Sequence, residues 1–144
     1  MKATVKQIVA AYNALGNTKS TKLEDSEKGK ILKARKAMRP IAEDYEAFLK
    51  DCQETLKPEN WDEIQTKLQK WQQEGEKTTL TEEERVEINK AVIDYQNKIN
   101  KVVKEELEKE VEINFEKLEE GANVKLMSAN DWTPNQLDEI EILL

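Results

Sequence analysis

Residues 80–108, LTEEERVEINKAVIDYQNKINKVVKEELE, decide the fold class of this sequence. Apolar side chains recur in this stretch at steps of four and three, the spacing of one helix face. They are Ile88, Val92, Tyr95, Ile99 and Val102. Thr81 and Glu84 have the pattern of a capping box, and the carboxylates after the cap suit the positive end of the helix dipole. The stretch therefore predicts one long helix over 81–109.

A second seam with the same alternation runs through residues 25–57. Its members are Met38, Ala42, Tyr45, Leu49, Cys52 and Leu56. Pro40 lies inside this segment and removes a backbone donor, so we expect a kink there or a break into two helices. Cys52 belongs to the seam, which predicts a small buried core residue rather than a reactive thiol. Two long, roughly antiparallel helices thus form the core of a mostly α helical bundle.

Shorter helices are expected on either side of the long ones. Residues 4–15 have an apolar face, with Thr4 as the N-cap and Gly16 as the stop. A helix that carries Trp61 and Trp71 on one stripe should end near Gly75. Two tryptophans on a stripe favour core or partner-facing anchors over a platform for ligand stacking.

The periodicity becomes ambiguous after residue 110 and fits either a strand or a continued helix. Alternation of Val111, Ile113 and Phe115 with polar residues favours a strand. Val124 and Leu126 are expected to form its hairpin partner. We therefore divide the chain into a helical domain, 1–110, and a C-terminal segment, 111–144, which holds this hairpin or extended stretch and a short last helix.

The C-terminal tail is apolar to its last residue. Thr133, Pro134 and Gln136 predict a helix start with a capping box. Two alternatives remain open: the tail docks on its own domain, or it docks on a partner. For the second alternative, the predicted partner-binding residues are those of the tail and of the strand available for edge pairing. They are Trp132, Leu137, Ile140, Leu143, Leu144, Val111, Ile113 and Phe115.

Composition excludes several kinds of chemistry. The 144 residues include no His and one Cys, which excludes a Ser-His-Asp triad, an imidazole metal site, a thiolate zinc site and an internal disulfide. The four glycines are far apart, so no phosphate-binding loop is present. The carboxylate clusters alternate with lysines, as on a solvated helix surface. We therefore predict a protein that is not an enzyme and takes no cofactor or metal.

Charge is unevenly distributed along the chain. Residues 1–39 carry 10 Lys/Arg and 3 Asp/Glu, whereas residues 40–144 carry 13 and 27, for a total of −7. The basic run that could contact phosphate comprises Lys30, Lys33, Arg35, Lys36 and Arg39. Attraction between the basic segment and the acidic helices is the favoured explanation, because the chain as a whole is acidic and no aromatic residues interleave the run.

No apolar run approaches the roughly 20 residues that span a bilayer. The N-terminal apolar stretch is interrupted by Lys6, Gln7 and Tyr12, which is untypical of a signal peptide. We therefore expect the protein to be located in the cytoplasm, without secretion or membrane association.

Two regions resemble small proteins encoded in the structural-gene clusters of tailed phages and prophages. The first runs from Ala14 to Leu49 and contains GKILKARKAMRPIAEDYEAFLKD at 29–51. The second runs over 107–118, LEKEVEINFEKL, and is followed by WTPNQL at 132–137. Residues 58–77 lie outside the resemblance. The resemblance implies a virion component or assembly factor that works through protein contacts, located in the cytoplasm of a bacterial host or in a virion. It assigns no functional residue.

The sequence therefore predicts a non-catalytic structural or assembly protein of a tailed bacteriophage. Its expected partners are other virion or assembly proteins. A homo-oligomer is also open, because heptad seams close either within one chain or between chains. The alternatives are a nucleic-acid-associated accessory protein that uses the basic helix and a helical adaptor or inhibitor of a host protein.

Overall fold

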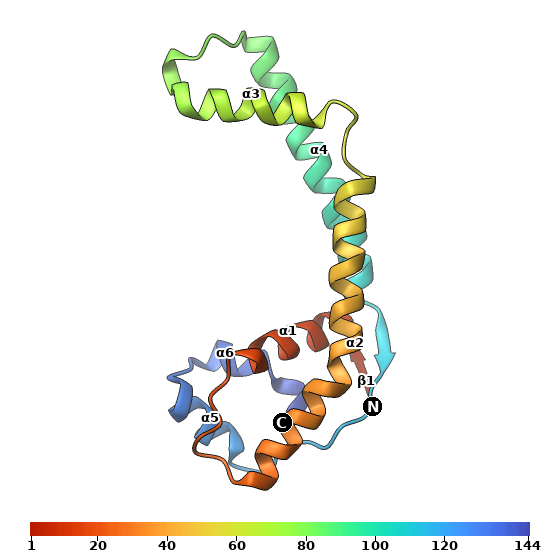
Figure 1. The fold of residues 1–144 in the computed structure, drawn as a ribbon, viewed down its shortest axis with the longest axis vertical. Helices are drawn as coiled ribbons and strands as arrows, with labels where there is room; N and C mark the ends of the chain where they lie inside the picture. The colour runs from red at the N-terminus through yellow and green to blue at the C-terminus, as the bar shows by residue number, and fades with distance from the viewer. The chain divides into compact units, whose positions relative to one another are not determined.

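The computed structural model describes all residues, 1–144, and is mostly α-helical (Figure 1). The elements, in chain order, are β1 (Lys2–Thr4), α1 (Val5–Gly16), α2 (Asp25–Thr55), α3 (Trp61–Glu74), the 3-10 turn η1 (Gly75–Lys77), α4 (Glu82–Leu107), β2 (Glu110–Glu112), α5 (Ala122–Asn130), α6 (Pro134–Asp138) and the 3-10 turn η2 (Glu141–Leu143). The predicted fold class, with two long helices, is confirmed.

The chain forms two compact units. Residues 1–48 and 105–144 form the first, here called the core unit, and residues 49–104 form the second, here called the inserted unit. The helices α2 and α4 each contribute to both units. The predicted domain boundary at residue 110 coincides with neither boundary of the inserted unit.

Capping residues fix the helix starts as predicted. The hydroxyl of Thr4 accepts a hydrogen bond from the backbone N–H of Gln7, and the Gln7 side chain accepts one from the backbone of Thr4. Thr133 and Gln136 make the same reciprocal pair at α6. Each pair satisfies two backbone donors that a helix end leaves without partners.

Pro40 does not break the helix, contrary to one of the two predicted outcomes. The helix α2 runs through it from Asp25 to Thr55. Pro40 is exposed, as is Lys36 one turn earlier, whose carbonyl loses its donor. Water can hydrogen-bond a carbonyl on this side of the helix, so the helix continues. Cys52, farther along α2, is buried as predicted.

The predicted C-terminal hairpin is wrong. The strand β2 pairs instead with β1, antiparallel, with Ala3 opposite Val111. Val124 and Leu126 lie in the helix α5, which begins after Gly121 at a φ of 88°. Glycine adopts this left-handed backbone conformation at little cost. Gly121 therefore stands at the start of a helix and not in the turn of the predicted hairpin. Local alternation predicted a strand from Val111 to Phe115, but the strand ends at Glu112. Its partner lies more than 100 residues away in the sequence.

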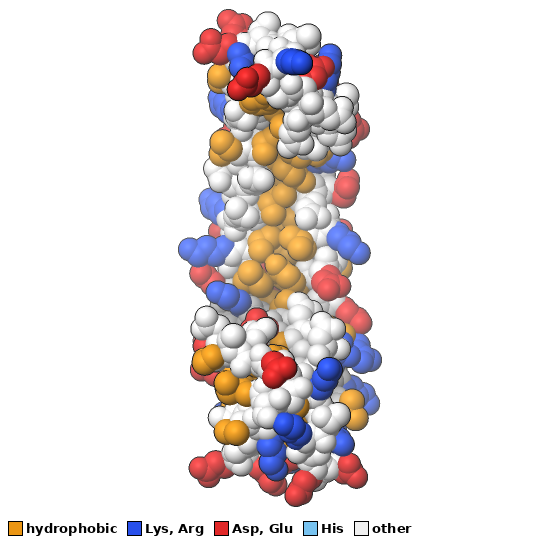
Figure 2. Space-filling model, turned by 90° about the vertical axis from the view of Figure 1, so that its left-hand side faces the viewer, with side chains coloured by type: hydrophobic (Ala, Val, Ile, Leu, Met, Phe, Trp, Pro, Cys, Tyr) orange, Lys and Arg blue, Asp and Glu red, His pale blue; other side chains and the backbone are white.

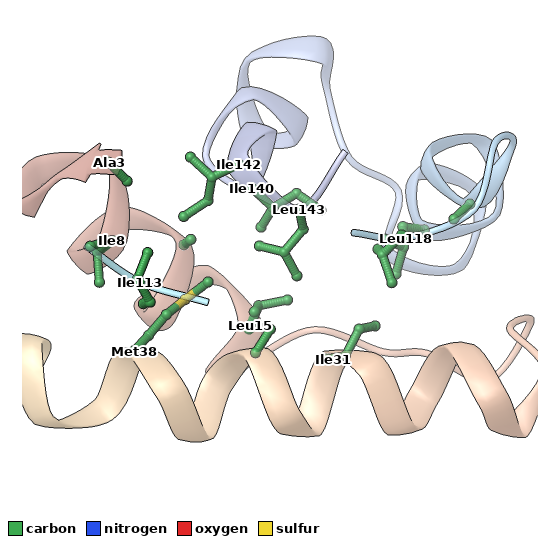
Figure 3. Packing of buried hydrophobic residues seen from close by; sticks show 14 of the residues in the cluster. Ala3, Ile8, Leu15, Ile31, Met38, Ile113, Leu118, Ile140, Ile142 and Leu143 are labelled. Atoms are coloured by element: carbon green, nitrogen blue, oxygen red, sulfur yellow. The ribbon is translucent and has the colours of Figure 1, made fainter. Parts of the chain in front are cut away.

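Almost all of the buried apolar side chains belong to the core unit, which holds 17 of the 20. Figure 3 shows Ile31 and Met38 projecting from α2 toward Leu15, Ile113 and Leu143. The inserted unit buries only Cys52, Ile64 and Ile88. Burial of apolar area is the main favourable contribution to folding, so the core unit has the larger source of stability.

Candidate functional site

The predicted tail site lies mostly inside the core unit. Ile140 and Leu143 are fully buried, and Ile113 is 5% exposed. Leu143 also accepts a 2.7 Å backbone hydrogen bond from the N–H of Leu118. The tail therefore docks on its own domain, which was one of the two alternatives. The expectation of a free partner-binding surface at these three residues is wrong, because contacts within the chain already cover them.

The other residues predicted for that site are more accessible. Trp132, Leu137, Val111 and Phe115 are partly buried and pack against the core. Leu144 is 39% exposed. The backbone of Val111 belongs to β2, whose pairing with β1 uses one edge of the strand. These residues therefore contribute more to packing than to a continuous open surface.

The basic run of α2 is divided by its contacts. The guanidinium of Arg35 lies 4.4 Å from the ring centroid of Tyr12, which is the geometry of a cation–π contact. The ammonium of Lys30 lies 3.0 Å from Oε1 of Glu27 and 3.9 Å from Oε1 of Glu119. Arg35 and Lys30 are thus engaged within the chain. The three remaining cations, Lys33, Lys36 and Arg39, are exposed and form no ion pair.

Glu27 is a residue whose role the sequence analysis missed. It is the one charged residue in the buried set, at 5% exposure. Its Oε2 atom accepts a 3.0 Å hydrogen bond from the N–H of Glu119, while Oε1 lies 3.0 Å from the ammonium of Lys30. The N–H of Glu119, aided by Lys30, holds the pKa of Glu27 below its ordinary value, although burial opposes this. The i,i+3 spacing with Lys30 was the available sequence signal.

The core unit also brings together residues predicted for different roles. A cavity of about 480 Å³ is lined by Phe115 together with Lys30 and Lys33. Asn114, Glu116, Lys117 and Met1 complete its lining. Phe115 comes from the segment after β2 and the two lysines from α2, so the fold and not the sequence spacing makes them neighbours.

The two tryptophans of the inserted unit have different surroundings: Trp61 packs against Tyr95, and Trp71 lines an open hollow. The rings of Trp61 and Tyr95 lie 4.4 Å apart between centroids, and the hydroxyl of Tyr95 donates a 2.6 Å hydrogen bond to the carbonyl of Gln53. These contacts join α3, α4 and the end of α2. Trp71 is half-buried and, with Leu68, lines a hollow of about 390 Å³ whose remaining lining is Gln72, Gly75 and Asn89. We call this hollow the Trp71 groove.

The apolar seam of the inserted unit is only half covered. Its large apolar side chains that are half-buried include Leu49, Leu56, Trp61, Leu68, Trp71, Val92, Tyr95, Ile99 and Val102. Figure 2 shows a row of apolar side chains along the helices, with charged side chains on both flanks. The inserted unit has too few helices to cover its apolar seam on every side, so part of this apolar surface stays in contact with solvent.

The structure contains no group of three or more acidic, His or Cys side chains arranged to hold a metal ion. None of its helices has the length and apolar character needed to cross a membrane. No family model, curated protein or solved structure matches this chain.

Proposed function

We propose that this protein is a non-catalytic structural or assembly protein of a tailed bacteriophage and that it works through protein–protein contacts. The phage assignment derives from the sequence resemblance of residues 14–49, 107–118 and 132–137. The contact mechanism derives from one observation, the Trp71 groove in a unit that leaves its apolar seam half covered. Tryptophan in a partly desolvated hollow is a common anchor of protein interfaces.

The lining of the groove suggests the kind of partner. Trp71 and Leu68 supply apolar walls, and Gln72 and Asn89 supply amides that can donate and accept hydrogen bonds. A partner segment that inserts one large apolar side chain and presents backbone polar groups at the rim would fit this lining. The partner we propose is accordingly another virion or assembly protein with an exposed apolar anchor.

Peptide mass spectrometry on gradient-purified particles tests the proposal. Particles are made from a strain whose copy of the gene is deleted and replaced by wild-type or variant genes. Under the proposal, wild-type protein is recovered in intact particles at a fixed ratio to the major structural proteins, or is required for their assembly. Normal particles that form without the gene and never contain its product would contradict the proposal.

Variants of the Trp71 groove test whether incorporation into particles, or particle assembly, depends on this groove. Gln72→Arg places a long charged side chain at the exposed rim without removing a packed residue. Trp71→Ala removes the anchor, and circular dichroism checks that it still folds. The matched control is Leu32→Arg, an equally drastic change at a residue that is 70% exposed in the core unit. The groove variants should lose incorporation or assembly at least tenfold, and the control should retain it.

The nucleic-acid alternative keeps one supporting observation. Lys33, Lys36 and Arg39 are exposed and unpaired at steps of three residues along α2. Replacing all three by Gln would abolish salt-sensitive DNA retention if this alternative held. The core unit carries 13 Lys/Arg against 18 Asp/Glu, so its overall charge opposes such binding. Protein contacts are for this reason the favoured function.

A further inference from the structure

The outer face of α4 carries exposed apolar residues that the fold leaves without a neighbour. Val86 is 60% exposed and Ile93 is 54% exposed. They are seven residues apart, so both lie on the same face of the helix. This face belongs wholly to the inserted unit and is distinct from the seam that contains Ile88 and Tyr95.

The spacing along this outer face is symmetric about Ile93. Read in either direction from Ile93, the exposed positions follow at steps of four, three and four. They are Glu82, Val86, Asn89, Ile93, Asn97, Asn100 and Lys104. An antiparallel copy of the helix, related by a two-fold axis at Ile93, would place Ile93 on Ile93 and Glu82 opposite Lys104. A two-fold interface requires this kind of self-complementary surface.

The charges that flank this face have the same symmetry. One row of exposed residues runs beside it: Glu83, Glu87, Lys90, Asp94, Lys98 and Lys101. In an antiparallel pair of helices, such a row lies against the same row of the copy. With the axis at or within one residue of Ile93, Glu83 meets Lys101, Glu87 meets Lys98, and Lys90 meets Asp94. Each contact occurs twice and joins opposite charges.

The chain itself does not use these charges. None of the six flanking residues, nor Glu82 or Lys104, forms an ion pair within the structure. The inserted unit as a whole has 10 Lys/Arg and 12 Asp/Glu, so two copies of it repel each other little. In this arrangement Ile93 meets Ile93 and Val86 meets Asn100, so the charge pattern and the central Ile93 contact are what indicate a second copy of the chain as the partner.

We propose that the outer face of α4 is a self-association surface and that its partner is a second copy of this chain, bound antiparallel about Ile93. The proposal does not rest on the phage assignment, and although the face shares Asn89 with the Trp71 groove, none of the variants that test it lies in the groove lining. Failure of either one leaves the other intact, because the groove is tested in particles and this face is tested with the isolated protein.

Charge reversal tests the pairing. One variant carries Glu83→Lys and Glu87→Lys, and the other carries Lys98→Glu and Lys101→Glu. Sedimentation equilibrium should show wild-type protein approaching twice the 16.7 kDa chain mass with rising concentration. Each variant alone should remain monomeric, since like charges then meet at both ends. An equimolar mixture should dimerise again, because both sets of contacts become complementary between unlike chains.

Three controls make the result decisive. Circular dichroism confirms that both variants fold. Glu43→Lys with Glu46→Lys changes the net charge by the same amount and sign as the Glu83/Glu87 variant, at exposed positions of α2 outside the inserted unit, and should leave dimerisation intact. Ile93→Asp should weaken the dimer at least tenfold, whereas Val124→Asp, at a 65% exposed apolar residue of the core unit, should not.

A wild-type protein that stays monomeric at every concentration would overturn the proposal. A dimer that tolerates both charge reversals would show that another surface forms it. Two monomeric variants that fail to dimerise when mixed would exclude the antiparallel arrangement about Ile93.

Discussion

Glu27 and Glu119 are 92 residues apart in the chain, and Oε2 of Glu27 accepts a 3.0 Å hydrogen bond from the backbone N–H of Glu119. The bond joins the first turn of α2 to the segment that precedes α5. A buried carboxylate is costly unless hydrogen bonds and a counter-charge compensate it. Here the N–H of Glu119 and the ammonium of Lys30 provide that compensation.

Glu27→Gln should destabilise the core unit. The substitution keeps the shape of the side chain but removes the charge that Lys30 and the N–H of Glu119 stabilise. A hydrogen bond to a charged group contributes about 1.5–3 kcal/mol, which is the expected loss in the free energy of unfolding. Urea unfolding of this variant and of Glu24→Gln, an exposed control, measures the difference. Equal losses in the two variants would show that Glu27 is not specially stabilised.

The contribution of Glu27 should also depend on pH. Its pKa in the folded state is lowered, chiefly by the N–H of Glu119, so the folded protein binds a proton there less readily than the unfolded chain does. The stabilisation is therefore complete above the ordinary glutamate pKa of about 4.3 and declines as the pH falls through the lower folded-state pKa. Unfolding measured from neutral to acidic pH should show the gap between wild type and Glu27→Gln narrowing on the acidic side. A stability difference that widens at acidic pH would contradict the lowered pKa of Glu27 in the folded state.

Leu143→Ala should be among the most damaging single changes. Leu143 is fully buried, and truncating such a leucine costs about 2–5 kcal/mol, whereas the more exposed Leu144→Ala should cost less than about 1 kcal/mol. Deletion of residues 131–144 should unfold the core unit, because Ile140 and Ile142 leave with the tail. Circular dichroism and thermal unfolding check both changes. A truncated chain with wild-type stability would place the tail outside the core.

The contact between Arg35 and Tyr12 should appear as a coupling energy. In a double-mutant cycle of Arg35→Gln and Tyr12→Leu, the interaction should contribute about 0.5–2 kcal/mol to the free energy of unfolding. Strictly additive effects of the two substitutions would mean that the ring and the guanidinium do not stabilise each other. Lys36→Gln, at an exposed cation of the same helix, is the matched control.

The long helices could be predicted because their signals are local. A seam such as Ile88–Val92–Tyr95 and a cap such as Thr133 act over a few residues, so the sequence contains all the information that they need. The strand at Val111 was predicted for the same reason. Its partner was not, because the pairing of Ala3 with Val111 depends on how the whole core unit closes.

The candidate site was harder to predict for a related reason. An apolar tail such as Ile140–Leu143 has the same composition whether it covers its own core or a partner, and only the fold distinguishes the two. Arg35 and Lys33 likewise look equivalent in the sequence, yet only Arg35 has a ring beneath it. The outer face of α4 was overlooked because the stronger seam on the opposite side of the helix defined the pattern.

The pairing of residues 2–4 with residues 110–112 has a consequence for synthesis on the ribosome. The chain emerges from its N-terminus, but the core that covers Ile8 and Met38 includes Ile140, Ile142 and Leu143, which are made after the whole inserted unit. Every residue of the inserted unit is therefore synthesised before the surrounding unit can close. Residues 1–48 keep their apolar faces uncovered until residues 105–144 follow, a state in which nascent chains are exposed to aggregation and to chaperones.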